Sequence, residues 1–256
     1  MISPPSNADP RHCEDALEFA DRVPEPNASG IIYKVAGNRE EREAAFRLVH
    51  RAYTQTGLIE ANPYGMRVTP YHLLDTTAVF IAVYQREVIC TLSLIGDGPL
   101  GIPMASIYEE EVASLRDAGH YVGEVSCLAD RRRELTRIMP VFVKLAKVMA
   151  QYARLQGMHN LLIAVHPRHT RFYKRFMAFD EFGGLKTYPT VRNNPAIACN
   201  LDFAKADRER PPCYEQFFGD PLPLEELRAC PMSAAEREYF APAAQFGQAI
   251  VPVAVE

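Results

Sequence analysis

The stretch "GEVSCLADRRR", residues 123–133, places a carboxylate, a hydroxyl and a thiol in an otherwise apolar segment that ends in three arginines. The pattern predicts a β-strand over residues 121–129. Successive side chains of a strand point to opposite faces of a sheet. The two expected faces are Glu124, Ser126 and Leu128, and Val125, Cys127 and Ala129. This alternation predicts that the Glu124 carboxylate and the Cys127 thiol face away from each other.

The segments after this strand predict an α/β fold. Residues 140–156 have apolar side chains at helical spacing, with Pro140 in the first turn and Gly157 just past the end. "NLLIAVHP", residues 160–167, is a continuous apolar run of the kind found in strands that are buried on both faces. A strand, a helix and a buried strand in this order indicate a right-handed βαβ unit.

The other patterned segments predict a mixed central sheet with flanking helices. Before the central strand we expect a strand over residues 31–36, a helix capped by Asn38, a hairpin over 78–97 and a helix ending at Gly119. After it we expect a short helix over residues 168–177, strands near 179–189 and 196–203, and short helices near 222–229 and 233–240.

Proline-rich ends frame this patterned part of the chain. We expect a loosely ordered arm over residues 1–30, one folded domain over 31–204, and an extension with short helices over 205–256. The sequence contains no internal repeat, and one domain is the default for a chain of this length.

The composition is that of an ordinary globular protein. The chain has 256 residues, 48% of them hydrophobic, and a formal net charge of −4, which gives no overall attraction to nucleic acid. The sequence shows no signal-peptide pattern and no apolar run of about 20 residues, so we expect a cytoplasmic protein without a transmembrane segment. The six cysteines lack the spacing of zinc ligands or of a disulfide framework, so we expect reduced thiols.

Glu124 is the first candidate for catalysis. Burying an ionised carboxylate in an apolar strand is costly, so an unpaired Glu124 would have a raised pKa, which suits a general base. The alternative is a structural glutamate that pairs with a neighbouring arginine or lies at the solvent-exposed end of the strand.

The arginines after the strand are candidates for anion binding. Arg131, Arg132 and Arg133 lie between the strand and the next helix, where α/β proteins commonly bind anions, and Arg137 extends the positive charge. The alternative is a solvated basic turn.

Residues 166–179, "HPRHTRFYKRFMAF", offer one further catalytic candidate. Tyr173 is either a proton donor for a leaving thiolate or one of several core aromatic residues. His166 and His169 have no cysteine or carboxylate at ligand spacing, so we expect no metal site. The GxSxG, P-loop and GxGxxG motifs are absent from the sequence, which argues against a serine hydrolase, a P-loop nucleotidase and a dinucleotide enzyme.

The order of these elements, with a carboxylate on the middle strand, resembles the GNAT N-acyltransferase fold. "FYKRFMAF", residues 172–179, resembles the F-Y-x-x-x-x-G-F segment of that superfamily, with Ala178 in place of the glycine. Residues 77–119, 123–133 and 164–191 are similar to the long-chain N-acyl amino acid synthase family, which is related to the acyl-homoserine-lactone synthases. The resemblance covers about residues 40–203.

This resemblance implies roles for five residues. Glu124 would act as the general base on the incoming amine, and Tyr173 would protonate the leaving thiolate. The backbone around Ser126, Cys127 and Leu128 would bind the acyl thioester and polarise its carbonyl group. The lactone synthases have an arginine at the position of Cys127, which argues against a homoserine-lactone product. Since Cys127 is expected to face away from Glu124, we expect no acyl-cysteine intermediate.

The segment after the central strand bears on the acyl donor. In ordinary acetyltransferases a glycine-containing loop there binds the pyrophosphate of coenzyme A, whereas "RRRELTRIMP", residues 131–140, has no glycine. The resemblance implies acyl-carrier protein as the donor in place of acyl-coenzyme A, and no permanently bound cofactor. The acidic surface of the carrier would dock on Arg131, Arg132, Arg133 and Arg137.

We therefore expect an enzyme that transfers a long-chain fatty acyl group from acyl-carrier protein to the α-amine of an amino acid. One alternative is a coenzyme A-dependent N-acetyltransferase of a small amine. Another is a GNAT-like module that binds an acyl group or a partner protein without turnover. Arg67 is either a partner for a substrate carboxylate or an ordinary surface residue.

Overall fold

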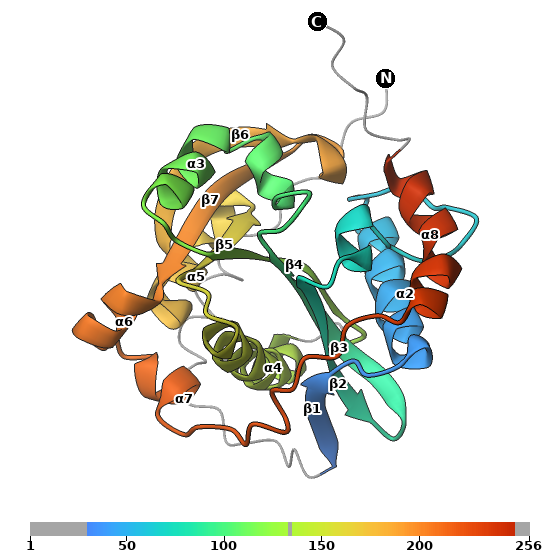
Figure 1. The fold of residues 1–256 in the computed structure, drawn as a ribbon, viewed down its shortest axis with the longest axis horizontal. Coiled ribbons are helices and arrows are strands. Elements are labelled where there is room, and N and C mark those ends of the chain that lie inside the picture. The colour runs from blue at the N-terminus through green and yellow to red at the C-terminus, as the bar shows by residue number, and fades with distance from the viewer. Residues whose placement is uncertain (1–29, 133–134, 249–256) are drawn as a thin grey trace, which may run out of the picture.

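A seven-stranded mixed sheet forms the centre of the protein (Figure 1). The computed structural model describes residues 30–132 and 135–248. The strands are β1 (Ile31–Val35), β2 (Thr77–Tyr84), β3 (Glu87–Gly96), β4 (Val122–Asp130), β5 (Asn160–Val165), β6 (Asp180–Tyr188) and β7 (Asn194–Asp202). Their order in the sheet is β1-β2-β3-β4-β5-β7-β6, and only β4 and β5 pair in parallel. The mixed sheet with flanking helices that the sequence predicts is confirmed.

Helices cover both faces of this sheet. They are α2 (Arg39–Gln55), α3 (Glu109–Asp117), α4 (Leu135–Leu155), α5 (Thr170–Met177), α6 (Phe203–Glu209), α7 (Tyr214–Phe218) and α8 (Ala234–Gln248). Four 3₁₀ helices are η1 (Pro70–Leu73), η2 (Pro103–Ser106), η3 (Pro167–His169) and η4 (Pro189–Val191). Phe80 of β2 packs with α4, whereas its neighbours Val79 and Ile81 pack in the cluster that contains Phe46 of α2, so α4 and α2 lie on opposite faces. Among the residues that the structure describes, no helix is both long and apolar enough to cross a membrane.

Local sequence signals place several of these elements as expected. The Asn38 side chain accepts a hydrogen bond from the backbone N–H of Glu41 at 2.9 Å and so caps α2. The β2–β3 hairpin turns at Gln85 and Arg86, whose φ angles of 49° and 66° are the left-handed values that this kind of tight turn needs, although neither residue is glycine. The predicted cap and hairpin are therefore confirmed.

Two expected helices differ from the sequence-based prediction. Helix α4 begins at Leu135, so Pro140 lies inside the helix and not in its first turn. Ile138 and Met139 pack against the core, and this burial stabilises a turn of helix before the proline despite the backbone N–H that proline lacks. Residues 222–229 contain turns, in which backbone hydrogen bonds join residues three positions apart. The prediction of a helix in this segment is therefore wrong.

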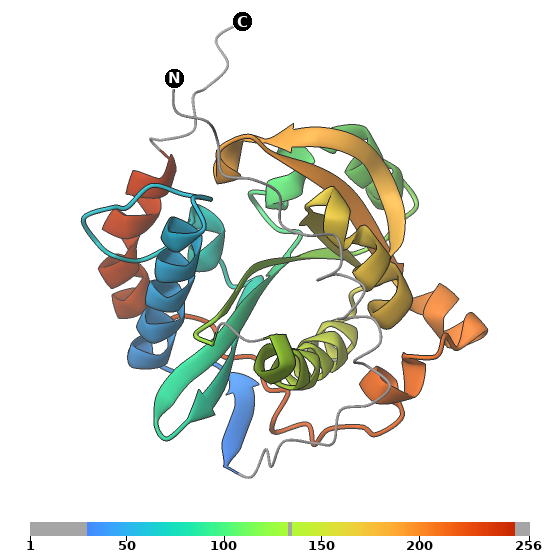
Figure 2. The same ribbon diagram turned by 180° about the vertical axis from the view of Figure 1, so that it is seen from behind.

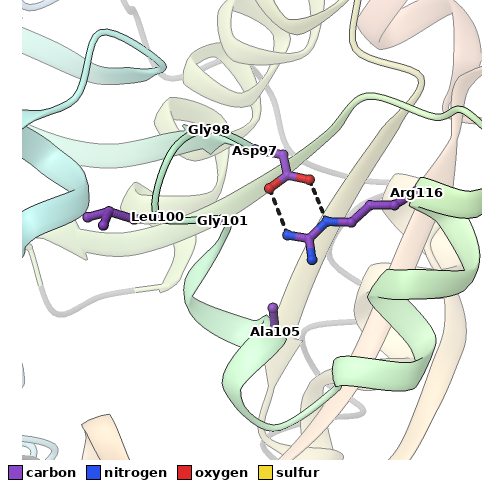
Figure 3. A pocket seen from close by; sticks show the side chains of 6 residues that line it. All are labelled: Asp97, Gly98, Leu100, Gly101, Ala105 and Arg116. Carbon is purple, nitrogen blue, oxygen red and sulfur yellow. Dashed lines mark hydrogen bonds and ion pairs between the residues drawn. The ribbon is translucent and has the colours of Figure 1, made fainter.

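An ion pair links the end of β3 to α3. Arg116 donates from Nε and Nη2 to the two carboxylate oxygens of Asp97, each at 2.7 Å (Figure 3). The pair borders an open pocket of about 670 Å³ whose lining residues are Asp97, Gly98, Leu100, Gly101, Ala105 and Arg116. This connection carries η2, which contributes directly to the candidate site described below.

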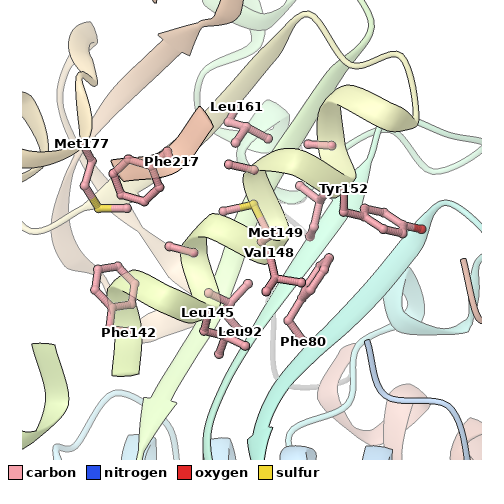
Figure 4. Packing of buried hydrophobic residues seen from close by; sticks show 14 of the residues in the cluster. Phe80, Leu92, Phe142, Leu145, Val148, Met149, Tyr152, Leu161, Met177 and Phe217 are labelled. Atoms are coloured by element: carbon pink, nitrogen blue, oxygen red, sulfur yellow. The ribbon is translucent and has the colours of Figure 1, made fainter. Parts of the chain in front are cut away.

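The main hydrophobic core lies between the sheet and α4. Side chains of α4 pack against β2, β3, β5, α5 and α7. Figure 4 labels ten members of this cluster: Phe80, Leu92, Phe142, Leu145, Val148, Met149, Tyr152, Leu161, Met177 and Phe217. Most of these side chains are almost fully buried. Buried apolar surface contributes about 25 cal/mol per Å², and this cluster has the most members of the clusters in the described residues.

The segments after residue 204 pack onto the helices of the domain. Helix α8 lies beside α2 in both views (Figures 1 and 2), and the fully buried Phe240 packs edge-on against Phe46 with ring centroids 5.2 Å apart. Arg42 and Glu236 form a buried ion pair between the two helices. On the other face, the Gln151 side chain of α4 donates a hydrogen bond to the carbonyl oxygen of Phe217 in α7 at 2.8 Å.

Candidate active site

The candidate site lies where β4 and β5 separate. The two strands pair only over Val122–Glu124 and Asn160–Leu162. Beyond this short ladder, β4 remains paired with β3, and β5 remains paired with β7. The parallel strands therefore diverge directly after Glu124, and we call this divergence the fork.

Glu124 is buried at the base of the fork. Its side chain is 2% exposed, and its Oε2 accepts a hydrogen bond from the backbone N–H of Met104 at 2.6 Å. The Tyr188 hydroxyl donates to Oε1 at 3.4 Å. Burial raises the pKa of Glu124 to about 7, although both hydrogen bonds lower it. Within the described residues no lysine or arginine forms an ion pair with Glu124, so this carboxyl group is poised to accept a proton near neutral pH.

Tyr108 holds the segment that presents the Met104 N–H. This tyrosine is fully buried at the start of α3, and its hydroxyl donates to the carbonyl oxygens of Gly184 at 2.9 Å and Ala196 at 2.8 Å. A Cβ atom at Gly183 would lie 2.6 Å from the Tyr108 ring, so only glycine leaves room for the tyrosine. Strands β6 and β7 therefore anchor η2 and keep the Met104 N–H directed at Glu124.

A β-bulge interrupts β4 between Glu124 and the end of the strand. Ser126 pairs with Ser93 and Ala129 pairs with Thr91, so β4 carries one more residue than β3 over this interval. Cys127 adopts a left-handed conformation with φ of 55°. The register gives Cys127 and Leu128 no partner on β3, and β5 has already diverged, so the bulge leaves backbone groups available at the fork.

The bulge overturns the predicted separation of Glu124 from Cys127. Val125 and Leu128 both pack against the α4 cluster, although they are three residues apart, whereas Cys127 packs with Ala129 against α2. The alternation has slipped by one residue, and Cys127 shares the face of Glu124. The expectation that the two face apart is wrong, because apolar alternation assumes an unbroken ladder. The Cys127 thiol is 5% exposed, and burial raises its pKa, so the thiol stays protonated at neutral pH.

Tyr173 lies on α5, which follows β5 on the other side of the fork. Its ring packs edge-on against Phe179 with centroids 6.0 Å apart, and burial raises its pKa to about 12, so the hydroxyl is protonated at neutral pH. Ala178 ends α5 in a left-handed conformation with φ of 57°, which explains why glycine suits this position. Tyr53 of α2 packs against the cluster that contains Cys127, and burial raises the pKa of this tyrosine.

The predicted arginine cluster is only partly described. Arg131 forms an ion pair with Glu87, and Arg132 binds both carboxylate oxygens of Asp130. Arg133 and the side chain of Arg137 lie outside the described residues. Both described arginines of the run thus have an acidic partner within the protein.

Basic residues also gather on the β5 side of the fork. Arg168, Arg171, Lys174 and Arg175 are exposed along η3 and α5. Lys174 lies 3.6 Å from Asp180. Among the described residues the three arginines have no carboxylate within ion-pair distance, so this surface carries more uncompensated positive charge than the described part of the predicted arginine run.

Sequence reasoning missed two groups that define the environment of Glu124. Met104 acts through its backbone N–H, so its side chain gives no signal in the sequence. Tyr188 is 64 residues from Glu124, and only the placement of β6 and β7 brings it near. Within residues 30–132 and 135–248, no group of three histidine, cysteine or carboxylate side chains is arranged to hold a metal ion, and the five described cysteines are free.

Comparisons with known proteins identify the family of this chain. The sequence model of the N-acyl amino acid synthase FeeM matches residues 44–202. The structure of FeeM, an N-acyl amino acid synthase from uncultured soil microbes, aligns with a TM-score of 0.62 at 28% identity, over 72% of this chain and 97% of FeeM. A search of curated proteins gave no match.

Two acyl-homoserine-lactone synthases share the fold. LasI aligns with a TM-score of 0.54 at 14% identity, over 77% of this chain and 98% of LasI. The coenzyme A-dependent synthase BjaI aligns with a TM-score of 0.51 at 18% identity, over 71% of this chain and 91% of BjaI. The resemblance found in the sequence is thereby confirmed. The FeeM model matches well over half of the length of this chain. The chain therefore belongs to the FeeM family of N-acyl amino acid synthases and is an acyltransferase.

Proposed function

We propose that the protein transfers a long-chain fatty acyl group from acyl-carrier protein to the α-amine of an amino acid. The observation that carries the proposal is Glu124, a buried carboxyl group with a pKa of about 7 at the fork of an acyltransferase of the FeeM family. A base with this pKa is partly deprotonated at neutral pH and can accept the proton of an attacking amine.

The reaction is an acyl transfer between a thioester and an amine. The thioester enters at the fork, and its carbonyl oxygen accepts hydrogen bonds from backbone N–H groups at Cys127 or Leu128, beside Ser126. The amine nitrogen attacks the carbonyl carbon and forms the new C–N bond, while Glu124 takes a proton from the nitrogen. The C–S bond breaks, and the leaving thiolate takes a proton from Tyr173. Proton exchange with solvent then restores both residues.

The carrier protein would dock at the rim of the fork. Arg131 and Arg132 follow β4, and the exposed arginines of η3 and α5 follow β5, so both strands lead to positive charge at the open end. An acidic carrier would be attracted to this rim while its prosthetic arm carries the thioester inward. Because Arg131 and Arg132 already pair with Glu87 and Asp130, the arginines of α5 are expected to contribute more of this attraction.

The test is product formation by the purified protein. Palmitoyl-acyl-carrier protein and, separately, palmitoyl-coenzyme A are incubated with an equimolar mixture of the standard amino acids, and products are identified by mass spectrometry. We expect N-palmitoyl amino acids with the carrier-protein donor and much less product with coenzyme A. Absence of N-acyl amino acids with both donors would contradict the proposal, and equal rates with both donors would contradict its carrier-protein part.

A further inference from the structure

Arg67 is partly buried and not at an isolated surface position. Burial raises the pKa of Cys127 and of Tyr53, and in both cases the positive charge of Arg67 opposes that shift. Burial and, second to it, the charge of Arg67 lower the pKa of His72 to about 3, so this histidine is neutral. The positive charge of Arg67 thus acts on side chains of α2, η1 and β4.

One edge of this guanidinium group is only partly paired. Nε of Arg67 is buried and has no hydrogen-bond partner among the described residues. Nη2, on the same edge, donates only a long hydrogen bond of 3.3 Å to the carbonyl oxygen of Thr190. A buried guanidinium donor without an acceptor is costly, so a polar partner at this edge would be strongly favoured.

The same edge binds a carboxylate elsewhere in this protein. Arg116 uses Nε and Nη2 to bind both oxygens of Asp97 at 2.7 Å, as Figure 3 shows. Arg132 binds Asp130 through the same two nitrogen atoms. A planar carboxylate matches this pair of guanidinium donors. Arg67, however, has no Asp or Glu within ion-pair distance in residues 30–132 and 135–248.

A short chain of contacts links Arg67 to Glu124. Arg67 binds the backbone of Thr190 in η4, and Tyr188, two residues earlier, donates its hydroxyl hydrogen bond to Glu124. The segment 188–190 thus borders both the cationic edge of Arg67 and the carboxyl group of Glu124.

We propose that Arg67 binds the α-carboxylate of the acceptor amino acid through its Nε and Nη2 edge and directs the α-amine toward Glu124. This inference rests on the proposed function and deepens it, because it assigns a substrate-binding residue and requires an acceptor with a free carboxylate. The amine and the carboxylate of an α-amino acid are attached to one carbon atom, so a cation on one side of the site and a base on the other orient the molecule.

Paired acceptors test this inference. Wild-type protein and Arg67→Gln are supplied with palmitoyl-acyl-carrier protein and an equimolar mixture of the standard amino acids or of their α-amides. We expect the wild type to acylate the amino acids at least about 10-fold faster than the amides. Arg67→Gln should lower the rate with amino acids by about 10- to 100-fold, through KM more than kcat, and leave the rate with amides almost unchanged. The preference for amino acids over amides should then fall toward one.

Two further variants separate recognition from folding. Arg67→Lys keeps the positive charge but loses the planar pair of guanidinium donors. This variant should retain only part of the preference for amino acids over amides. Arg47→Gln is the matched control, because Arg47 also binds a nearby loop carbonyl, that of Tyr64, but already pairs with Glu43. Its preference should equal that of the wild type. The ratio of the two rates is independent of the folded fraction, so partial unfolding does not obscure the result.

The outcomes distinguish the inference from the proposed function. An Arg67→Gln protein that keeps the wild-type preference for amino acids would overturn the role of Arg67 while leaving the proposed function intact. A wild-type protein that forms no N-acyl product from either mixture, with carrier protein or with coenzyme A as donor, would overturn both.

Discussion

Two opposing effects set the pKa of the Glu124 carboxyl group. Burial raises its pKa, and hydrogen bonds from the Met104 N–H and the Tyr188 hydroxyl lower it, with a net value of about 7. An exposed glutamate would be ionised at neutral pH but would be a weaker base. The environment, and not the residue type alone, gives Glu124 the proton affinity that a general base needs.

Removing the Tyr188 hydroxyl should shift the pKa of Glu124 in a measurable direction. Tyr188→Phe deletes a donor that stabilises the ionised carboxylate, so the pKa of Glu124 should rise. The inflection in the pH dependence of kcat/KM should move to higher pH, and kcat/KM at pH 7 should fall about two- to fivefold. Tyr214→Phe removes a similar hydrogen bond, to Asp207 at 2.7 Å and away from the site, and should leave the profile unchanged. A Tyr188→Phe profile that coincides with that of the wild type would show that the hydroxyl does not act on the base.

The sequence indicates some of these residues and not others. Glu124 is recognisable because apolar neighbours surround it in a predicted strand. The direction of Cys127 is not recognisable, because the bulge depends on pairing with β3 and changes the face without changing the apolar pattern. The partners of Glu124 come from η2 and the end of β6, and contacts over such sequence distances depend on topology.

At the scale of elements, β6 and α3 form a support for η2. The fully buried Tyr108 ring fills the space over Gly183, and its hydroxyl binds backbone carbonyl groups of β6 and β7. This packing sets the position of η2, and therefore of the Met104 N–H that contacts Glu124.

Gly183→Ala should disturb this support. Its Cβ would lie 2.6 Å from the rigid, fully buried ring of Tyr108, so the ring or the strand must move. We expect a loss of about 1–3 kcal/mol in the free energy of unfolding, together with reduced activity. Gly184→Ala is the matched control, since a Cβ at Gly184 has no atom within 4 Å. Urea unfolding of both variants checks this, and equal stabilities would contradict the proposed packing role.

The elements themselves were more predictable than their arrangement. The β4, α4 and β5 segments follow from apolar periodicity, and the αL end of α5 at Ala178 matches a position that favours glycine. The insertion of β7 between β5 and β6 was not predictable, because strand order depends on long-range pairing. The early start of α4 was missed because tertiary packing of Ile138 and Met139 outweighs the proline signal.

Considered as a whole, the molecule has a net charge of −4 but concentrates positive charge near the fork. The exposed arginines of η3 and α5 lack ion-pair partners among the described residues, unlike Arg131 and Arg132. A local basic rim on an acidic protein suits selective docking of an acidic carrier and is sensitive to salt.

Charge reversal should separate the two sides of this rim. Arg171→Glu with Arg175→Glu should lower kcat/KM for palmitoyl-acyl-carrier protein by about 10-fold or more and change the rate with palmitoyl-coenzyme A much less. Arg131→Glu with Arg132→Glu should have a smaller effect, because those arginines are already neutralised by Glu87 and Asp130. Steady-state kinetics with both donors measures this. Equal loss with both donors would indicate damage to the site and contradict carrier docking.

Glu124→Gln keeps the shape of the Glu124 side chain and removes the carboxyl group proposed as the general base. Folding of this variant is checked first by thermal unfolding at pH 8. The pKa of Glu124 is raised from 4.5 to about 7 in the folded protein, so ionising Glu124 costs stability as the pH rises through this interval. The neutral glutamine avoids that cost, and the variant should be at least as stable as the wild type above pH 7.

The most direct measurement is the pH dependence of kcat/KM for N-acyl amino acid formation by the wild type and Glu124→Gln. The wild-type rate should rise with pH through an inflection near 7, as Glu124 loses its proton. Glu124→Gln should be about 100- to 10,000-fold slower, with no such inflection. A folded Glu124→Gln protein with wild-type turnover, or with the same inflection near pH 7, would contradict the assignment of Glu124 as the base.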